Sequence, residues 1–210
     1  MLSLLDLIFP KYCLGCKRSG KYICEKCIEK VETKPTYQQR NIYPLDGLVS
    51  LWSYSGVVRS VIIKLKYKFV TDVASEITKL AIRRLGNFEE ILPKSAVIVP
   101  IPLQKLRKNW RGFNQAELIG KRLAYEKGWG YEPNLLVKTQ KTKPQAELTR
   151  IERLTNLQGM FQINPFVKLN KSKPIILFDD VYTTGATLKE ACGELKRGGY
   201  KKVWGLTLAR

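Results

Sequence analysis

Short apolar runs mark the expected strands of this chain. Ala96–Val99 and Ile175–Phe178 contain apolar residues without alternation, which is typical of strands buried on both faces of a parallel sheet. The second run is followed at once by polar residues, as at the end of a central strand. Further strands are expected at Gly47–Tyr54, Leu135–Val137, Met160–Ile163 and Tyr200–Ala209.

The segments between these runs show helical spacing. Leu188, Ala191, Cys192 and Leu195 would fall on one side of a helix that begins after Gly185, which makes Cys192 a core residue. Strands that alternate with helices predict an α/β fold, a parallel sheet flanked by helices, over residues 45–210. The other expected helices are Gly56–Tyr67, Asp72–Leu85, Ala116–Lys127 and a short one within Leu148–Asn156.

The first 34 residues form a separate predicted module, joined to the rest by a Pro-containing linker, Thr33–Pro44. Apolar residues between Leu2 and Ile8 predict a short amphipathic helix, which packs on the body or lies on a membrane surface. This run is too short to span a membrane and lacks the flanking features of a signal peptide. We therefore expect a cytoplasmic protein without a transmembrane segment.

Four cysteines in this module have metal-ligand spacing. Cys13 and Cys16 form one C-x₂-C pair, Cys24 and Cys27 form a second, and seven residues separate the pairs. Two such pairs complete a tetrahedral site with four sulfur ligands, which predicts a structural zinc ion, with an iron–sulfur centre as the alternative. A disulfide framework is disfavoured in a cytoplasmic chain.

The polar segment after Ile175–Phe178 has the composition of a phosphate-binding loop. Asp179 and Asp180 follow the strand, and hydroxyl residues surround Gly185 at the start of the next helix. A helix N-terminus attracts anions, and the two carboxylates, exposed at the loop, would bind ribose hydroxyls directly or through Mg²⁺. The simpler alternative is an ordinary helix N-cap.

A basic loop follows Ala96–Val99 and precedes the helix at Ala116. In parallel α/β sheets, ligands bind on loops at the carboxyl ends of strands, so this loop would reach a diphosphate in the same crevice; a solvated basic loop is the alternative. The loop residues expected to contact the diphosphate are Lys105, Arg107 and Arg111. Asn114 and Gln115 carry side-chain donors that a packing role would not require, so they are also expected at this site.

The chain is strongly basic and contains no histidine. Lys and Arg number 37 against 18 Asp and Glu, so the formal net charge of the 210 residues is +19. Such a charge favours a polyanionic partner, either nucleic acid, an acidic membrane surface or a phosphorylated ligand, although a merely solvated surface would have the same composition. The absence of histidine removes the commonest general base.

Several motifs together resemble the ComF family, which comprises competence protein FC-like proteins. The four-cysteine module is followed in order by Leu65–Tyr67, Val99–Pro102, Arg111–Gln115, residues 142–161 and finally Phe178–Thr187. The last of these resembles the phosphoribosyl pyrophosphate (PRPP) motif of type I phosphoribosyltransferases. The resemblance implies a type I phosphoribosyltransferase-like fold with an N-terminal four-Cys zinc finger.

The resemblance also implies site residues and a biological role. PRPP and Mg²⁺ would be bound by Asp179, Asp180, Val181, Tyr182, Thr183, Thr184, Gly185, Ala186 and Thr187. The resemblance also implies a diphosphate or DNA side formed by Lys66, Arg111, Asn114 and Gln115. Asp179, Asp180 and Arg111 would be the catalytic residues if the protein transfers the phosphoribosyl group. The implied role is natural transformation, in which the protein would handle incoming single-stranded DNA in the cytoplasm.

Three interpretations remain open from the sequence. The protein is an active phosphoribosyltransferase acting on an unidentified nucleophile, or it binds PRPP and single-stranded DNA without turnover, with bases stacking on Trp52, Trp110 or Tyr182. In the third interpretation, the zinc finger and the N-terminal helix dock to a helicase or to a membrane pore, at the inner membrane. The former phosphoribosyltransferase site is then only a structural scaffold.

Overall fold

The computed structural model describes residues 10–31, 36–38, 42–67, 71–104, 110, 112–139 and 159–210. The predicted N-terminal helix and the helical stretch within Leu148–Asn156 lie outside these residues. The strands are β1 (Thr36–Gln38), β2 (Gly47–Trp52), β3 (Val97–Pro100), β4 (Gly130–Tyr131), β5 (Leu136–Lys138), β6 (Phe161–Ile163), β7 (Ile175–Val181) and β8 (Val203–Ala209). The helices are α2 (Glu25–Glu29), α3 (Gly56–Lys64), α4 (Thr71–Leu85), η1 (Gly86–Phe88), α6 (Gln115–Lys127) and α8 (Ala186–Arg197).

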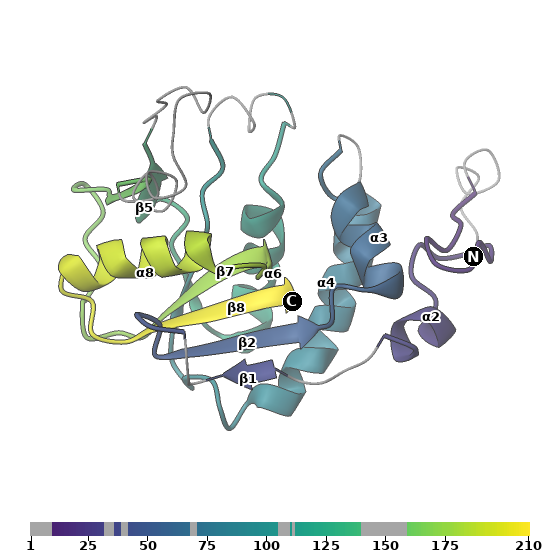
Figure 1. Ribbon diagram of the computed structural model, residues 1–210, viewed down its shortest axis with the longest axis horizontal. Helices are drawn as coiled ribbons and strands as arrows, with labels where there is room; N and C mark the ends of the chain where they lie inside the picture. Colours follow the sequence, from purple (N-terminus) through teal and green to yellow (C-terminus); the bar gives the residue numbers. More distant parts are fainter. Residues whose placement is uncertain are drawn as a thin grey trace.

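Six of these strands form one sheet, in the order β1-β2-β8-β7-β3-β4 (Figure 1). All neighbours from β2 to β4 pair in parallel, which confirms the predicted α/β class. Strand β1 pairs antiparallel with β2 at the edge, within the segment Thr33–Pro44 that was expected to be a linker. The linker prediction was wrong here, because three residues with no proline among them, including the β-formers Thr36 and Tyr37, extend the sheet by backbone hydrogen bonds.

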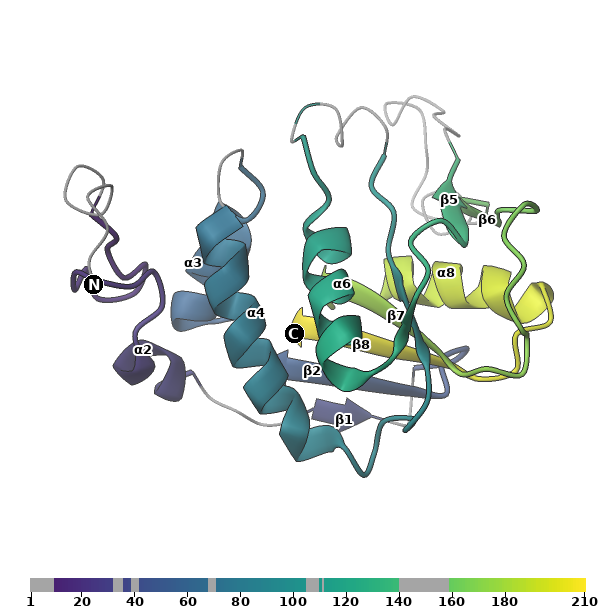
Figure 2. The same ribbon diagram turned by 180° about the vertical axis from the view of Figure 1, so that it is seen from behind.

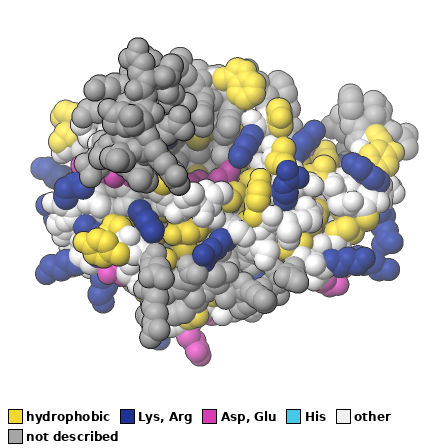
Figure 3. Space-filling view, in the orientation of Figure 1, with side chains coloured by type: hydrophobic (Ala, Val, Ile, Leu, Met, Phe, Trp, Pro, Cys, Tyr) yellow, Lys and Arg dark blue, Asp and Glu magenta, His cyan; other side chains and the backbone are white. Residues whose placement is uncertain are grey.

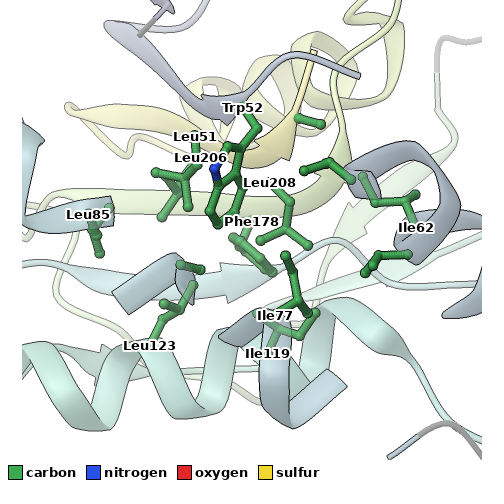
Figure 4. Packing of buried hydrophobic residues seen from close by; sticks show 14 of the residues in the cluster. Leu51, Trp52, Ile62, Ile77, Leu85, Ile119, Leu123, Phe178, Leu206 and Leu208 are labelled. Carbon is green, nitrogen blue, oxygen red and sulfur yellow. The ribbon is translucent and has the colours of Figure 1, made fainter. Parts of the chain in front are cut away.

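Helices cover both faces of the sheet (Figures 1 and 2). Helices α3, α4 and α6 pack on one face, where Phe178, Leu206 and Leu208 of the sheet meet Ile62, Ile77 and Ile119 of the helices (Figure 4). Helix α8 and the antiparallel pair β5–β6 cover the opposite face. Cys192 is fully buried there, as expected for a core residue.

Strand β7, at the middle of the sheet, is longer than the apolar run predicts. It extends to Val181 because Asp179 and Val181 continue the parallel pairing, opposite Thr207 and Ala209 of β8. Asp179 and Asp180 therefore belong to the strand and not to the loop. The expectation that both carboxylates are exposed at a loop was wrong: Asp180 is buried and Asp179 is half-buried.

The cysteine module packs against α3 and α4 through its own apolar residues. Ile23 and Val31 are buried in the same cluster as the interior of α3 and α4. The backbone N–H of Ile23 donates to Glu76 Oε2 of α4 at 2.9 Å, and Lys11 forms an ion pair with Asp72 at 2.9 Å. The module and the body thus share one hydrophobic core. Among the described helices, none has the length and apolar character needed to cross a membrane.

Candidate functional site

A pocket of about 170 Å³ opens at the carboxyl ends of β3 and β7. Parallel α/β sheets bind ligands at this edge, because neighbouring strand ends and their loops converge there. Six predicted site residues line it: Lys66, Asn114, Gln115, Asp179, Asp180 and Thr187. The remaining walls are Ile101, Pro102 and Leu103 after β3, and Lys138 of β5.

The two carboxylates are held in different ways. Asp180, only 8% exposed, accepts a hydrogen bond at Oδ2 from Gln115 Nε2 at 3.1 Å. Asp179 Oδ1 accepts from the backbone N–H of Asp180 at 2.8 Å. Desolvation and the neighbouring charge of Asp180 raise the pKa of Asp179 well above its usual value, while Lys138 acts in the opposite direction. Bringing a cation or a hydroxyl donor to this pair would relieve the repulsion between the carboxylates.

Asn114 has a clear structural role. Its Oδ1 accepts from the N–H of Ala116 at 3.0 Å, so it is the N-cap of α6. Its Nδ2 donates to the carbonyl of Ile101 at 3.0 Å and to Glu117 Oε1 at 3.2 Å. The expectation that the donors of Asn114 have no packing purpose was therefore wrong. They fix the start of α6 to the loop after β3, which places Gln115 next to Asp180.

The loop between β7 and α8 is shaped by one close approach. Gly185 has φ +77°, and a Cβ at this position would overlap the ring of Tyr182, which is buried beneath it. The guanidinium carbon of Arg210 also lies over this ring, 5.5 Å from its centroid. Thr183 and Thr184 are exposed on the loop, and Thr184 Oγ1 accepts from the N–H of Ala186 at 3.4 Å. The glycine thus allows the first turn of α8 to sit directly on Tyr182.

Other predicted residues fall in several places. Lys105, Arg107 and Arg111 lie outside the described residues. Trp52 and Tyr182 were proposed as stacking platforms for bases, but both are buried, so that proposal was wrong for them. Trp110 is 64% exposed.

Lys138 was missed by the sequence interpretation, which named no residue of β5 as part of the site. Its ammonium also lies 5.4 Å from the ring centre of Phe161. A basic residue directly after the expected strand Leu135–Val137 was the only available signal.

The four N-terminal cysteines form a compact cluster. Their Sγ atoms all lie within 4.8 Å of one another, a donor set that could hold a metal ion. Desolvation opposes ionisation of the Cys13 thiol, but backbone N–H groups of Cys16, Cys24 and Gly15 outweigh it and lower its pKa to about 6. Hydrogen bonding with Cys24 raises the pKa of Cys27 to about 12. A Cβ at Gly15 would lie 2.9 Å from Cys27 Sγ, so only glycine lets the two pairs approach this closely.

No family model matches the chain, but several characterised proteins do. Competence protein F of Haemophilus influenzae is 29% identical over 210 residues, which cover 96% of this chain and 86% of that protein. Competence protein ComFC of Bacillus subtilis is 31% identical over 165 residues, 77% of this chain and 63% of that protein. DNA utilization protein YhgH of Salmonella typhi is 28% identical over 180 residues, 84% of this chain and 72% of that protein. The chain belongs to the ComF family.

The pocket brings together motifs that lie far apart in the sequence of this ComF family chain. Lys66, the loop after Val99–Pro102, Gln115 and the Asp179–Thr187 segment meet at one edge of the sheet. Each lies at or next to an end of a different element, and the parallel topology brings those ends together.

The surface charge of the ComF family chain is widely distributed. Figure 3 shows Lys and Arg side chains at many separate places on one face, with few acidic side chains between them. A basic surface of this kind raises the local concentration of any polyanion.

Proposed function

We propose that this chain binds PRPP, or a related phosphorylated ribose, in the pocket between β3 and β7, and that it serves DNA uptake or DNA utilization in the cytoplasm. The observation that carries the proposal is the meeting of the Asp179–Asp180 pair with Lys66, Lys138 and the start of α8 in one pocket. Carboxylates suit ribose hydroxyls, whereas ammonium groups and a helix N-terminus suit phosphates. A sugar phosphate needs both, side by side.

The residues present fit a Mg²⁺ ion that accompanies the ligand. Carboxylate oxygens are the ligands that Mg²⁺ prefers, and the ion would be held by Asp179 and Asp180 together with the diphosphate of PRPP. When bound, the Mg²⁺ ion would neutralise part of the charge on the diphosphate. The chain itself would orient Asp180 through Gln115, and Lys66 and Lys138 would bind anionic oxygens.

The cysteine cluster fits a structural zinc ion. Four sulfur ligands leave no open coordination position, so the ion would stabilise residues 1–34 as a module on the domain formed by 45–210 and would not take part in catalysis. The names of the relatives, competence protein and DNA utilization protein, support the DNA-related role. Single-stranded DNA is the proposed macromolecular ligand, drawn by the basic surface. A helicase or a pore at the inner membrane remains a proposed protein partner.

Phosphoribosyl transfer itself is the second candidate, favoured by the same carboxylate pair. In such a reaction diphosphate leaves ribose C1, and the cationic side chains would stabilise its growing charge. With no histidine in the chain, the proton lost by the acceptor would pass to a carboxylate of the pocket or to the departing diphosphate.

Calorimetric titration with PRPP, with and without Mg²⁺, tests the proposal. We expect Mg²⁺-dependent binding by the native protein and none by the Asp179→Asn, Asp180→Asn double variant. Glu90→Gln, which neutralises an exposed carboxylate distant in sequence from the pocket residues, is the matched control and should bind normally. Diphosphate release with candidate acceptors then separates turnover from binding.

Binding of single-stranded DNA has a different signature. It should weaken log-linearly with salt as counterions are released, whereas PRPP binding should depend chiefly on Mg²⁺. If the native protein fails to bind PRPP at millimolar concentration in Mg²⁺, the proposal for the pocket is wrong, and DNA binding must be explained without it.

A further inference from the structure

A second, larger hollow lies away from the strand ends, between α4 and α6. It has a volume of about 600 Å³, and the described residues that line it all belong to these two helices. Figure 2 shows the two helices side by side over the sheet, with this side toward the viewer. None of its lining residues belongs to the pocket described above, so it is a separate feature.

The floor of the hollow is aliphatic and follows helical spacing. Ala74, Thr78 and Ile82 recur every four residues on α4, and Leu118 begins the opposite wall on α6. Thr78 donates its hydroxyl to the carbonyl of Ala74 at 2.6 Å, so this polar group is already satisfied. Leu118 is 43% exposed, so it adds apolar surface to the wall of the hollow. Each wall is two helical turns long, roughly 12 Å.

The rim is basic. Lys79 and Arg83 stand one turn apart on α4, and both side chains are exposed. Arg122 lies on α6 and pairs with Glu126 of the same helix at 2.5 Å. Three cations therefore face one carboxylate, and that carboxylate is already paired.

We propose that this groove, defined by Ala74, Ile82, Leu118, Lys79, Arg83 and Arg122, binds an acidic amphipathic helix of a partner protein. A trough between two packed helices accepts a third helix by ridges-into-grooves packing, with apolar anchors at i, i+4 and i+7. Carboxylates beside those anchors would meet the rim cations. Aliphatic floors offer no surface for base stacking, which argues against single-stranded DNA as the occupant.

A second copy of this chain is a poor occupant. Among the described helices, every one longer than five residues carries a net positive charge: α3, α4, α6 and α8. Such a helix would meet the rim cations with like charge. The charge of the rim therefore favours an acidic helix of another protein over the described helices of a second copy.

The probe for the test is a fluorescein-labelled synthetic peptide of about 18 residues, long enough to populate a helix, with leucines at i, i+4 and i+7 and glutamates beside them. Its control carries glutamine in place of glutamate. Fluorescence anisotropy with the full-length, zinc-loaded protein should show saturable binding of the acidic peptide and at least about tenfold weaker binding of the glutamine peptide. Added salt should weaken the binding of the acidic peptide.

Three variants locate the binding. Lys79→Glu with Arg83→Glu, and separately Leu118→Asp, should each weaken the acidic peptide at least about tenfold. Lys121→Glu reverses an exposed charge on α6 that does not line the groove, and it should leave binding within about twofold. Urea titration checks that each variant is folded, independently of whether the pocket at the strand ends binds PRPP.

Four outcomes would overturn the proposal. The first is the absence of saturable peptide binding at about 100 µM, and the second is equal affinity for the two peptides. The third is a loss of peptide affinity in Lys121→Glu as large as in the groove variants. The fourth is an unchanged peptide affinity in the rim variants. If labelled oligothymidylate binds and is lost in the rim variants while the acidic peptide does not bind, the groove takes nucleic acid. If native protein sediments as a dimer and Leu118→Asp sediments as a monomer, the occupant is a second copy.

Discussion

Substituting Gly185 by alanine should damage the pocket through a single steric conflict. Gly185 adopts φ +77°, where a residue with a Cβ costs about 1–2 kcal/mol. Its Cβ would also lie 2.5 Å from Tyr182 Cε2 and closer still to Cζ and Oη. Tyr182 is 6% exposed, so its ring cannot move aside freely, and such overpacking adds about 1–3 kcal/mol.

The two contributions can be separated by a matched glycine. Gly128 ends α6 with φ +64°, and no heavy atom lies within 4 Å of the place that a Cβ would take there, so Gly128→Ala should cost only the backbone part, about 1–2 kcal/mol. Gly185→Ala should lower the free energy of unfolding by about 2–5 kcal/mol in urea titration. It should also abolish PRPP binding, because the start of α8 is displaced.

A double-mutant cycle gives the decisive measurement. Leucine at position 182 removes the Cζ and Oη atoms that conflict with the new methyl group. In the Tyr182→Leu background, Gly185→Ala should therefore cost only the backbone part, leaving a coupling energy of about 1–3 kcal/mol. If Gly185→Ala destabilises no more than Gly128→Ala, or if the coupling energy is zero, the close approach does not constrain the loop and the reasoning is wrong.

Three further perturbations follow from other contacts. Because the pKa of Asp179 is raised in the folded state, its contribution to stability is present at low pH and is lost as the pH rises through that pKa. Asp179→Asn should remove this loss, so the fall in unfolding free energy between about pH 4 and neutrality, measured by urea titration, should become smaller. An unchanged pH profile would contradict this. Removing the metal proposed for the cysteine cluster with a chelator should raise amide hydrogen exchange in α4 around Glu76 as well as in the cysteine module, because the backbone N–H of Ile23 donates to Glu76. Faster exchange confined to the cysteine module would contradict this coupling. Asn114→Ala should destabilise by about 1–2 kcal/mol in urea titration, since α6 loses its N-cap and the tie to Ile101, whereas Asn114→Asp should keep the cap and lose less.

The sequence by itself determined the fold class, the order of most elements and the two chemically distinctive clusters. Uninterrupted apolar runs and helical spacing are local properties, so β3, β7, α4 and α6 could be predicted within a few residues. The cysteine pairs and the Asp179–Thr187 segment are also local, because a C-x₂-C turn and a strand–loop–helix unit carry their chemistry within a few consecutive residues. The prediction of a linker over Thr33–Pro44 failed because β1 depends on a non-local contact: it forms only where β2 offers an edge to pair with.

Only the tertiary structure decided which residues meet. Gln115 and Asp180 are 65 positions apart, and their hydrogen bond depends on the start of α6 lying beside the end of β7. Lys138 enters the pocket from a small separate sheet, a placement that no spacing in the sequence encodes. Burial of Asp180 and of the Tyr182 ring likewise depends on neighbouring elements. Periodicity shows which face of an element is apolar, but the contacts of its polar ends are long-range, and they become defined only when the parallel sheet aligns the carboxyl ends of its strands.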